Sequence, residues 1–271
     1  MIRAPRRGWP STITGIVLLG LMLFPVYWTV NASLQPTGSA LQGSWFPFHP
    51  DFSGYTTAIR DQARNLVTSL VVALGSVLLS LTLAAPAAYA LARFRLRGAD
   101  LVLFGILVTQ MVPSIVVANA LYSAYNDLGL LNSTLGLVLA DSTTGVPFAI
   151  IVLRSFMQGI PEEIIEAARA DGAGRLRTFC SVVLPVSVNS LITAALFTFL
   201  LAWSDFLFAL TLTTTQTTRP ITLGIYEYIG AHTNQWNATM ATAVLASVPA
   251  AVLLGVAQRY VAPGVTSGAV K

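Results

Sequence analysis

The stretch PEEIIEAARADG, residues 161–172, is a polar segment that lies between two apolar blocks of the chain. Pro161 suits the first position of a helix, where its missing N–H is not needed. The two glutamates that follow it favour the positive end of a helix dipole. Gly172 can adopt the left-handed conformation that ends a helix. The stretch therefore predicts a short amphipathic helix, whose apolar face holds Ile164, Ile165 and Ala168.

Such a helix has two uses when it lies between membrane segments. It can fill a groove on a partner protein, because its small alanines allow a close approach. It can equally be a surface helix or a solvated connector. Local shape alone leaves both interpretations open.

The composition of the chain indicates a membrane protein. Of its 271 residues, 55% are hydrophobic and 10% are charged, whereas a soluble protein carries about 25% charged residues. Continuous apolar runs recur along the chain, and about 20 such residues span a bilayer as a helix. We therefore expect an all-α polytopic membrane protein.

Six apolar runs are expected to span the membrane, at residues 13–30, 66–92, 101–122, 135–153, 188–212 and 240–257. The first is expected to be a retained helix, because it is longer than the apolar core of a signal peptide. The fourth is expected to be broken by the polar run Asp141–Gly145 and by Pro147. Residues 31–65 and 213–239 are expected to form outer loops.

The positive residues predict the orientation of these spans, because cytoplasmic loops are rich in Lys and Arg. With the N-terminus placed in the cytoplasm, that side holds Arg3, Arg6, Arg7, Arg93, Arg95, Arg97, Arg154, Arg169, Arg175, Arg177, Arg259 and Lys271. The outer side then holds Arg60, Arg64 and Arg219. Both termini and the segment 161–172 are therefore expected to be cytoplasmic.

A wider motif surrounds the short helix. Glu166-Ala167-Ala168, Gly172, Val182 and Leu184-Pro185 keep fixed spacings, and they resemble the cytoplasmic EAA signature of permease subunits of ATP-binding-cassette (ABC) importers. Val182 replaces the usual isoleucine. The resemblance implies that this loop docks on an ATPase subunit through Glu166, Ala167, Ala168, Asp171, Gly172, Leu184 and Pro185.

Three further segments resemble the maltose-transporter type of sugar-importer permease, namely Ala87–Phe94, Trp203–Phe206 and Gly264–Lys271. The resemblance implies a type I ABC importer permease fold with six transmembrane helices. It divides the chain into 1–65 (N-terminus, first helix and outer loop), 66–258 (a core of five helices with the coupling loop 156–187) and 259–271 (a cytoplasmic tail).

The resemblance also implies partners in the bacterial inner membrane. These are a second homologous permease, a cytoplasmic ATPase homodimer, an external solute-binding lipoprotein and a saccharide cargo. ATP and Mg²⁺ are expected on the ATPase, with no cofactor bound by this chain. The only lysine is Lys271, so the chain lacks a phosphate-binding P-loop. The net charge of +4 is explained by membrane orientation and requires no nucleic acid.

Two aspartates fall inside expected spans, where ionisable residues are costly and often mark a transport pathway. Asp141 and Asp205 are therefore pathway candidates, and related permeases usually carry an apolar or aromatic residue near the position of Asp141. The ordinary alternative makes each aspartate an interface residue or a helix cap. Further candidates that could contact a sugar are Gln110, Asn119, Tyr122 and Trp203, whose ordinary alternatives are hydrogen bonds between helices and packing. Two carboxylates favour a neutral or cationic saccharide.

The sequence is compatible with alternatives to this function. Cys180 lies in the cytoplasmic loop, while His49 and His232 lie in outer loops, which disfavours a nucleophile–base pair or a metal site. An ion-coupled carrier or a channel is the alternative class, and the break expected at Asp141–Gly145 is a feature of such carriers. The same permease role for a non-sugar solute such as glycerol phosphate is a further alternative.

Overall fold

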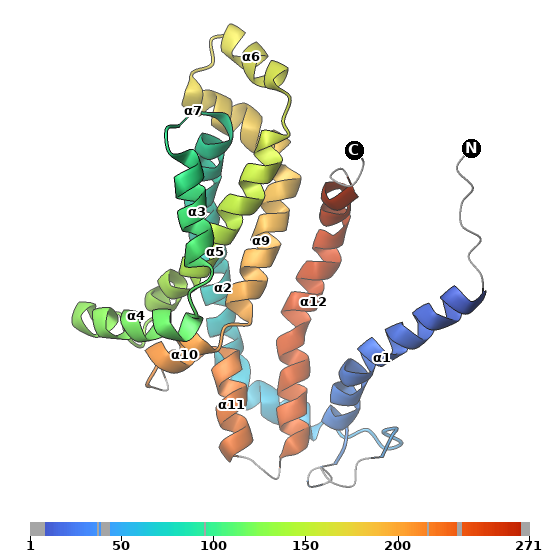
Figure 1. The fold of residues 1–271 in the computed structure, drawn as a ribbon. Coiled ribbons are helices and arrows are strands. Elements are labelled where there is room, and N and C mark those ends of the chain that lie inside the picture. The colour runs from blue at the N-terminus through green and yellow to red at the C-terminus, as the bar shows by residue number, and fades with distance from the viewer. Residues whose placement is uncertain are drawn as a thin grey trace. The chain divides into compact units, whose positions relative to one another are not determined.

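A computed structural model describes residues 9–36, 38, 44–94, 96–215, 217–231 and 235–266, and its regular structure there is helical (Figure 1). The first helices are α1 (Trp9–Ser33), α2 (Ser53–Arg93), α3 (Ala99–Thr109), α4 (Ser114–Leu128) and α5 (Thr134–Gln158). A series of short helices follows, namely α6 (Glu162–Ala170), α7 (Arg175–Thr178), the π-helix η1 (Phe179–Val183) and α8 (Leu184–Val186). The last are α9 (Val188–Trp203), α10 (Leu207–Leu212), α11 (Ile221–Ala231) and α12 (Trp236–Thr266).

Four of these helices, α1, α2, α5 and α12, are each long and apolar enough to cross a membrane. Two bent pairs also pass this test, α3 with α4 at an angle of 92° and α7–α8 with α9 at 77°. Counting each bent pair as one span gives six. The prediction of an all-α polytopic membrane protein is confirmed.

The chain divides into two compact units. One contains residues 1–63 and 225–247, and the other contains residues 64–224 and 248–271. In the first unit the Tyr55 hydroxyl lies 2.7 Å from that of Ser33, which joins the ends of α1 and α2. The second unit contains the short loop helices and the candidate pathway residues, so the site lies there. The division at residues 65 and 258 stays a prediction.

Three expected spans differ from the structure. The third is not one helix, because α3 ends at Thr109 and α4 begins after Pro113, whose ring excludes a normal helical bond. The fifth ends at Trp203 and resumes at Leu207. The fourth, in contrast, runs unbroken through Pro147.

The polar run in α5 does not break the helix because its hydroxyls are satisfied within it. Ser142, Thr143 and Thr144 donate to the carbonyls of Val138, Ala140 and Asp141 at 2.6, 2.6 and 2.9 Å. Bonds of this kind keep Ser and Thr inside a helix. The break that would have favoured a carrier is therefore absent from α5.

The expected outer loops are partly helical. α2 begins at Ser53, twelve residues before the end of the loop expected at 31–65, and the Ser53 N–H donates to the Asp51 carboxylate at 2.8 Å. This bond caps the helix start. The segment 213–239 contains α11 and the first turn of α12. His232 lies outside the described residues, as do Arg3, Arg6, Arg7, Arg95 and Lys271.

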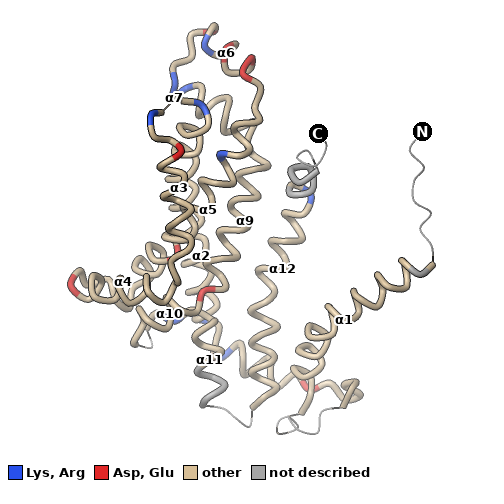
Figure 2. Tube along the Cα trace, viewed as in Figure 1, with Lys and Arg blue, Asp and Glu red and all other residues tan. Residues whose placement is uncertain are grey.

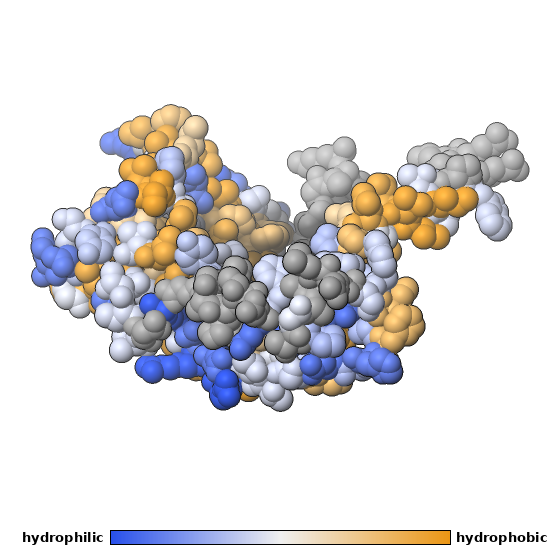
Figure 3. Space-filling view, turned by 90° about the horizontal axis from the view of Figure 1, so that it is seen from below, coloured by the Kyte–Doolittle hydropathy of each residue, from blue (hydrophilic) through white to orange (hydrophobic). Residues whose placement is uncertain are grey.

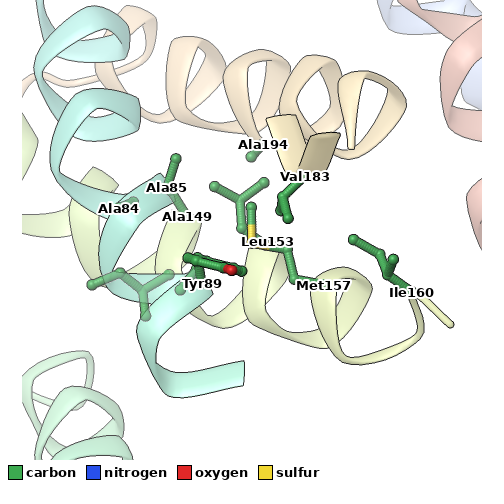
Figure 4. Packing of buried hydrophobic residues seen from close by; sticks show 11 residues of the cluster. Ala84, Ala85, Tyr89, Ala149, Leu153, Met157, Ile160, Val183 and Ala194 are labelled. Carbon is green, nitrogen blue, oxygen red and sulfur yellow. The ribbon is translucent and has the colours of Figure 1, made fainter. Parts of the chain in front are cut away.

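The core of the second unit joins α2, α5 and the start of α9 near the loop helices (Figure 4). Leu153 and Met157 on α5 point toward Tyr89 on α2 and toward Val183, and all four are buried. Small residues such as Ala84, Ala149 and Ala194 let the helices approach closely. Hydrophobic side chains elsewhere stay on the surface (Figure 3), as expected for helices that face lipid.

Candidate functional site

The helix expected at residues 161–172 is present as α6. Pro161 is its N-cap, one residue before the first helical position predicted for it, with φ −54° and ψ 137°. At the other end Gly172 has φ 80°, as predicted. The N–H groups of Gly172 and Ala173 donate to the carbonyls of Arg169 and Ala168, each at 3.0 Å. These two bonds form a Schellman cap, which fixes the direction in which the chain leaves α6.

α6 presents most of its motif to solvent and is anchored by one side chain. Ile165 is 3% exposed, whereas the expected face-mate Ile164 is 39% exposed. Glu166, Ala167, Asp171 and Gly172 are exposed, and Ala168 is half-buried. The motif is therefore accessible, while Ile165 anchors the helix.

The Leu184-Pro185 end of the motif forms an elbow before α9. Residues Phe179–Val183 form a π-helix, and the Leu184 N–H bonds to the Phe179 carbonyl five residues back. Pro185 has no N–H to donate and its ring crowds the carbonyl four residues earlier, which this wider turn accommodates. Leu184 packs against the α2–α5 core, and Pro185 is exposed.

The end of α2 packs against the loop helices. The Tyr89 ring lies 5.2 Å from Phe179 and 5.6 Å from Phe94, measured between centroids. The Arg175 guanidinium lies 5.3 Å from the centroid of the Phe94 ring, and the Arg93 guanidinium donates to the Ile160 carbonyl. The loop helices are thereby in contact with the end of α2 and with Ile160, which follows α5.

Charged residues collect at the α6–α7 end of this unit (Figure 2). The described basic residues there include Arg93, Arg97, Arg169, Arg175 and Arg177, and the acidic residues include Glu162, Glu163 and Glu166. At the opposite end Arg64 and Arg219 donate to the carbonyls of Thr217 and Thr215. The unequal distribution matches the charge asymmetry that orients membrane proteins.

Two adjoining pockets lie in the second unit, away from α6. One of about 480 Å³ is lined by Gln110, Thr143 and Thr144 among others. The second, of about 300 Å³, is lined by both Asp141 and Asp205. Four residues line both pockets, namely Ser114, Thr144, Leu201 and Phe208. The pockets therefore share one wall, which is built from α4, α5 and α9–α10.

The two aspartates differ in their surroundings. Asp205 caps α10, since its carboxylate accepts the N–H groups of Phe208 and Ala209 at 3.3 and 3.1 Å. Its carbonyl accepts the Thr222 hydroxyl at 2.6 Å. Asp141 is 5% exposed on α5, and its printed hydrogen bond among the described residues is at the backbone, where its carbonyl accepts the Thr144 hydroxyl at 2.9 Å.

The other pathway candidates separate into two groups. Gln110 lines the larger pocket. Asn119 and Tyr122 are exposed on α4 and line neither pocket. Trp203 is 7% exposed and stacks on Phe199 at 5.4 Å between ring centroids, so it packs within the protein.

Sequence reasoning did not select Ser114 or Ser204, which line the pocket beside the aspartates. Ser114 begins α4 and Ser204 lies in the break after α9. The signal for Ser114 was the preceding Pro113, because a proline inside a span exposes backbone and polar groups at the break. The signal for Ser204 was its place in the segment Trp203–Phe206, which resembles sugar-importer permeases.

Comparisons with known proteins agree with this architecture. The chain is 33% identical over 269 residues to the diacetylchitobiose uptake system permease DasC of Streptomyces coelicolor, covering 98% of this chain and 97% of that protein. It is 32% identical over 270 residues to the trehalose transport system permease SugB of Mycobacterium tuberculosis, covering 98% of each.

A crystal structure of a bacterial ABC transporter that imports the acidic polysaccharide alginate contains a similar chain. Its TM-score is 0.78 at 25% identity, covering 95% of this chain and 99% of that one. Residues 80–267, more than half of the chain, match the family model of binding-protein-dependent transport system inner membrane components. The chain therefore belongs to the family of inner membrane components of binding-protein-dependent transport systems.

Proposed function

We propose that this chain is a permease subunit of an ATP-driven, binding-protein-dependent sugar importer. Family membership supports the transport role. The names of the diacetylchitobiose and trehalose permeases support a saccharide cargo. Within this proposal the chain forms half of the translocation pathway, and it is a transport subunit that performs no catalysis.

The observation that carries the proposal is an exposed helix fixed to the membrane core. Glu166, Ala167 and Asp171 are accessible on and beside α6. Ile165 is buried, and the following elbow packs on α2 and α5. A subunit that grips α6 would therefore transmit its movement to the helices that line the pockets.

The partners in this proposal are those that the transport role of the family calls for. A cytoplasmic ATPase homodimer holds ATP and Mg²⁺ and contacts Glu166, Ala167, Ala168, Asp171 and Gly172. A second homologous permease completes the pathway, and an external solute-binding lipoprotein delivers the sugar. Both termini of this chain lie in the cytoplasm of a bacterial cell, on the side of α6.

Reversal of one exposed charge on α6 tests the proposal. We expect Glu166→Arg to reduce cargo-stimulated ATPase activity and uptake at least tenfold in the assembled transporter. The substitution replaces a negative charge at the proposed contact by a positive one, which would repel the basic groups of the ATPase that face Glu166 and so disrupt docking. Reconstituted proteoliposomes containing all subunits would measure both quantities. Copurification of the ATPase subunit would report docking directly.

Asp100→Arg is the matched control. Asp100 is also exposed, lies in the first turn of α3 and is outside the coupling helix. We expect this variant to keep its ATPase subunit and most of its uptake. Full ATP-dependent uptake by the Glu166→Arg transporter would refute the proposed coupling role, and gradient-driven flux through the purified chain alone would favour a carrier.

A further inference from the structure

The smaller pocket has an acidic wall. Asp141 on α5 and Asp205 between α9 and α10 both line it, together with the hydroxyl-bearing residues Ser114, Thr144 and Ser204. Among the residues described around the two pockets, the two aspartates are the ionisable ones. Any molecule in this pocket therefore meets acidic groups and hydroxyls with no basic side chain beside them.

The two aspartates differ in how far their hydrogen bonds are supplied by the chain itself. Asp205 receives two backbone N–H donors from the start of α10, so its hydrogen-bonding needs are partly met within the chain. Asp141 is 5% exposed and has no such donor among the described residues. Asp141 lines the pocket, so a hydroxyl or ammonium group of a molecule held there can donate to its free carboxyl oxygens.

The family does not decide the charge of the cargo. The alginate importer carries an acidic polysaccharide, whereas trehalose, named for the mycobacterial relative, is an uncharged sugar. Both kinds of cargo are therefore handled by chains with this fold. Side chains that line the pathway, including those of this chain, are therefore one source of selectivity for the charge of the cargo.

We propose that the pocket containing Asp141 and Asp205 is a cargo subsite that accepts a saccharide through its hydroxyl or ammonium donors and rejects anionic solutes such as sugar acids and glycerol phosphate. Like charges facing each other across a contact disfavour the wrong partner. This inference rests on the proposed transport function and narrows its cargo to a non-anionic saccharide.

Charged thiol reagents test the potential in the pocket without requiring a known cargo. The parent for this test carries Ser114→Cys in the pocket and Cys180→Ala, so that the introduced thiol is the reactive one. The assembled transporter in permeabilised membranes is treated with the cationic trimethylammonium-ethyl, the anionic sulfonato-ethyl or the neutral methyl methanethiosulfonate. The ratio of the cationic to the anionic reaction rate is then compared among variants.

We expect the cationic reagent to react faster in the parent. Loss of one unit charge roughly 6 Å away through water changes this rate ratio by about tenfold. The double variant Asp141→Asn and Asp205→Asn should lower the ratio furthest, and each single variant should lower it less, because two neighbouring carboxyl groups in a buried pocket disfavour each other's ionisation. Asn is nearly isosteric with Asp, and its single amide oxygen can accept one of the two N–H groups that Asp205 accepts, so part of the α10 cap is kept.

Leu128→Cys, in the same Cys180→Ala background, provides the matched control. Leu128 is 70% exposed at the end of α4 and lines neither pocket, so its rate ratio should not respond to either aspartate substitution. The neutral reagent corrects for changes in access. A double variant with the same ratio as its parent would overturn the inference. Because this readout does not depend on uptake, it is independent of the Glu166→Arg test of the proposed function.

Discussion

At the scale of single residues, the coupling segment depends on a backbone conformation that glycine provides. Gly172 has φ 80°, and a Cβ added there would meet nothing within 4 Å. A larger side chain at this position therefore meets backbone strain and no collision. The left-handed conformation costs an ordinary residue roughly 1–2 kcal/mol, and asparagine tolerates it better than most.

We expect Gly172→Val to loosen the cap that fixes Ala168 and Ala173, and to lower cargo-stimulated ATPase activity severalfold. Gly172→Asn should lose less, because its short polar side chain is tolerated in this conformation. Activity of both assembled transporters would be measured beside the parent. Equal losses in the two variants would show that the side chain, and not the backbone strain, causes the defect.

At the scale of elements, α2, α5 and α9 cross at one glycine. A Cβ on Gly145 would lie 2.6 Å from the Ser80 Oγ and 2.9 Å from the Thr198 Cγ2. The hydroxyls of Ser80 and Thr198 are buried and have no hydrogen-bond partner among the described residues. The crossing is therefore held by close contact between helices, as is common in membranes.

We expect Gly145→Ala to destabilise the purified chain by about 1–3 kcal/mol through overpacking. Ser80→Ala should restore part of this loss, because the nearest remaining Ser80 atom, Cβ, would be 3.5 Å away. Ser80→Ala alone should be nearly neutral, since its hydroxyl makes no bond. Thermal denaturation of the four proteins in detergent measures the coupling, and additive effects would contradict the contact.

At the scale of the whole molecule, the single cysteine reports orientation. Cys180 is exposed in the loop that follows α6, at the end of the second unit where positive residues collect (Figure 2). The positive-inside rule places that end in the cytoplasm. Leu128, at the end of α4, then lies toward the outside.

We expect a membrane-impermeant maleimide to label Cys180 in inverted membrane vesicles and not in right-side-out vesicles. A Leu128→Cys variant that lacks Cys180 should give the opposite result. Vesicles stripped of ATPase subunits would expose the loop fully. Labelling of Cys180 from the outer side would reverse the topology and remove α6 from reach of any cytoplasmic ATPase.

Some of the site followed from local sequence alone. The caps of α6 depend on Pro161 and Gly172, which act over one helical turn, and the motif around Glu166 identified the exposed segment. Which polar residues share a pocket could not be predicted, because Asp141 and Asp205 are brought together by the packing of α5 against α10. Asn119 and Tyr122 were further candidates, and they line neither pocket.

The sequence by itself determined that this protein is a helical membrane protein with a short polar helix at residues 162–170, because apolar length and helix capping are local properties. Only the tertiary structure decided where the spans bend and which side chains line the two pockets. Pro113 separates two helices while Pro147 lies within one, and a proline inside a span is compatible with both outcomes because the surrounding structure decides whether the helix continues.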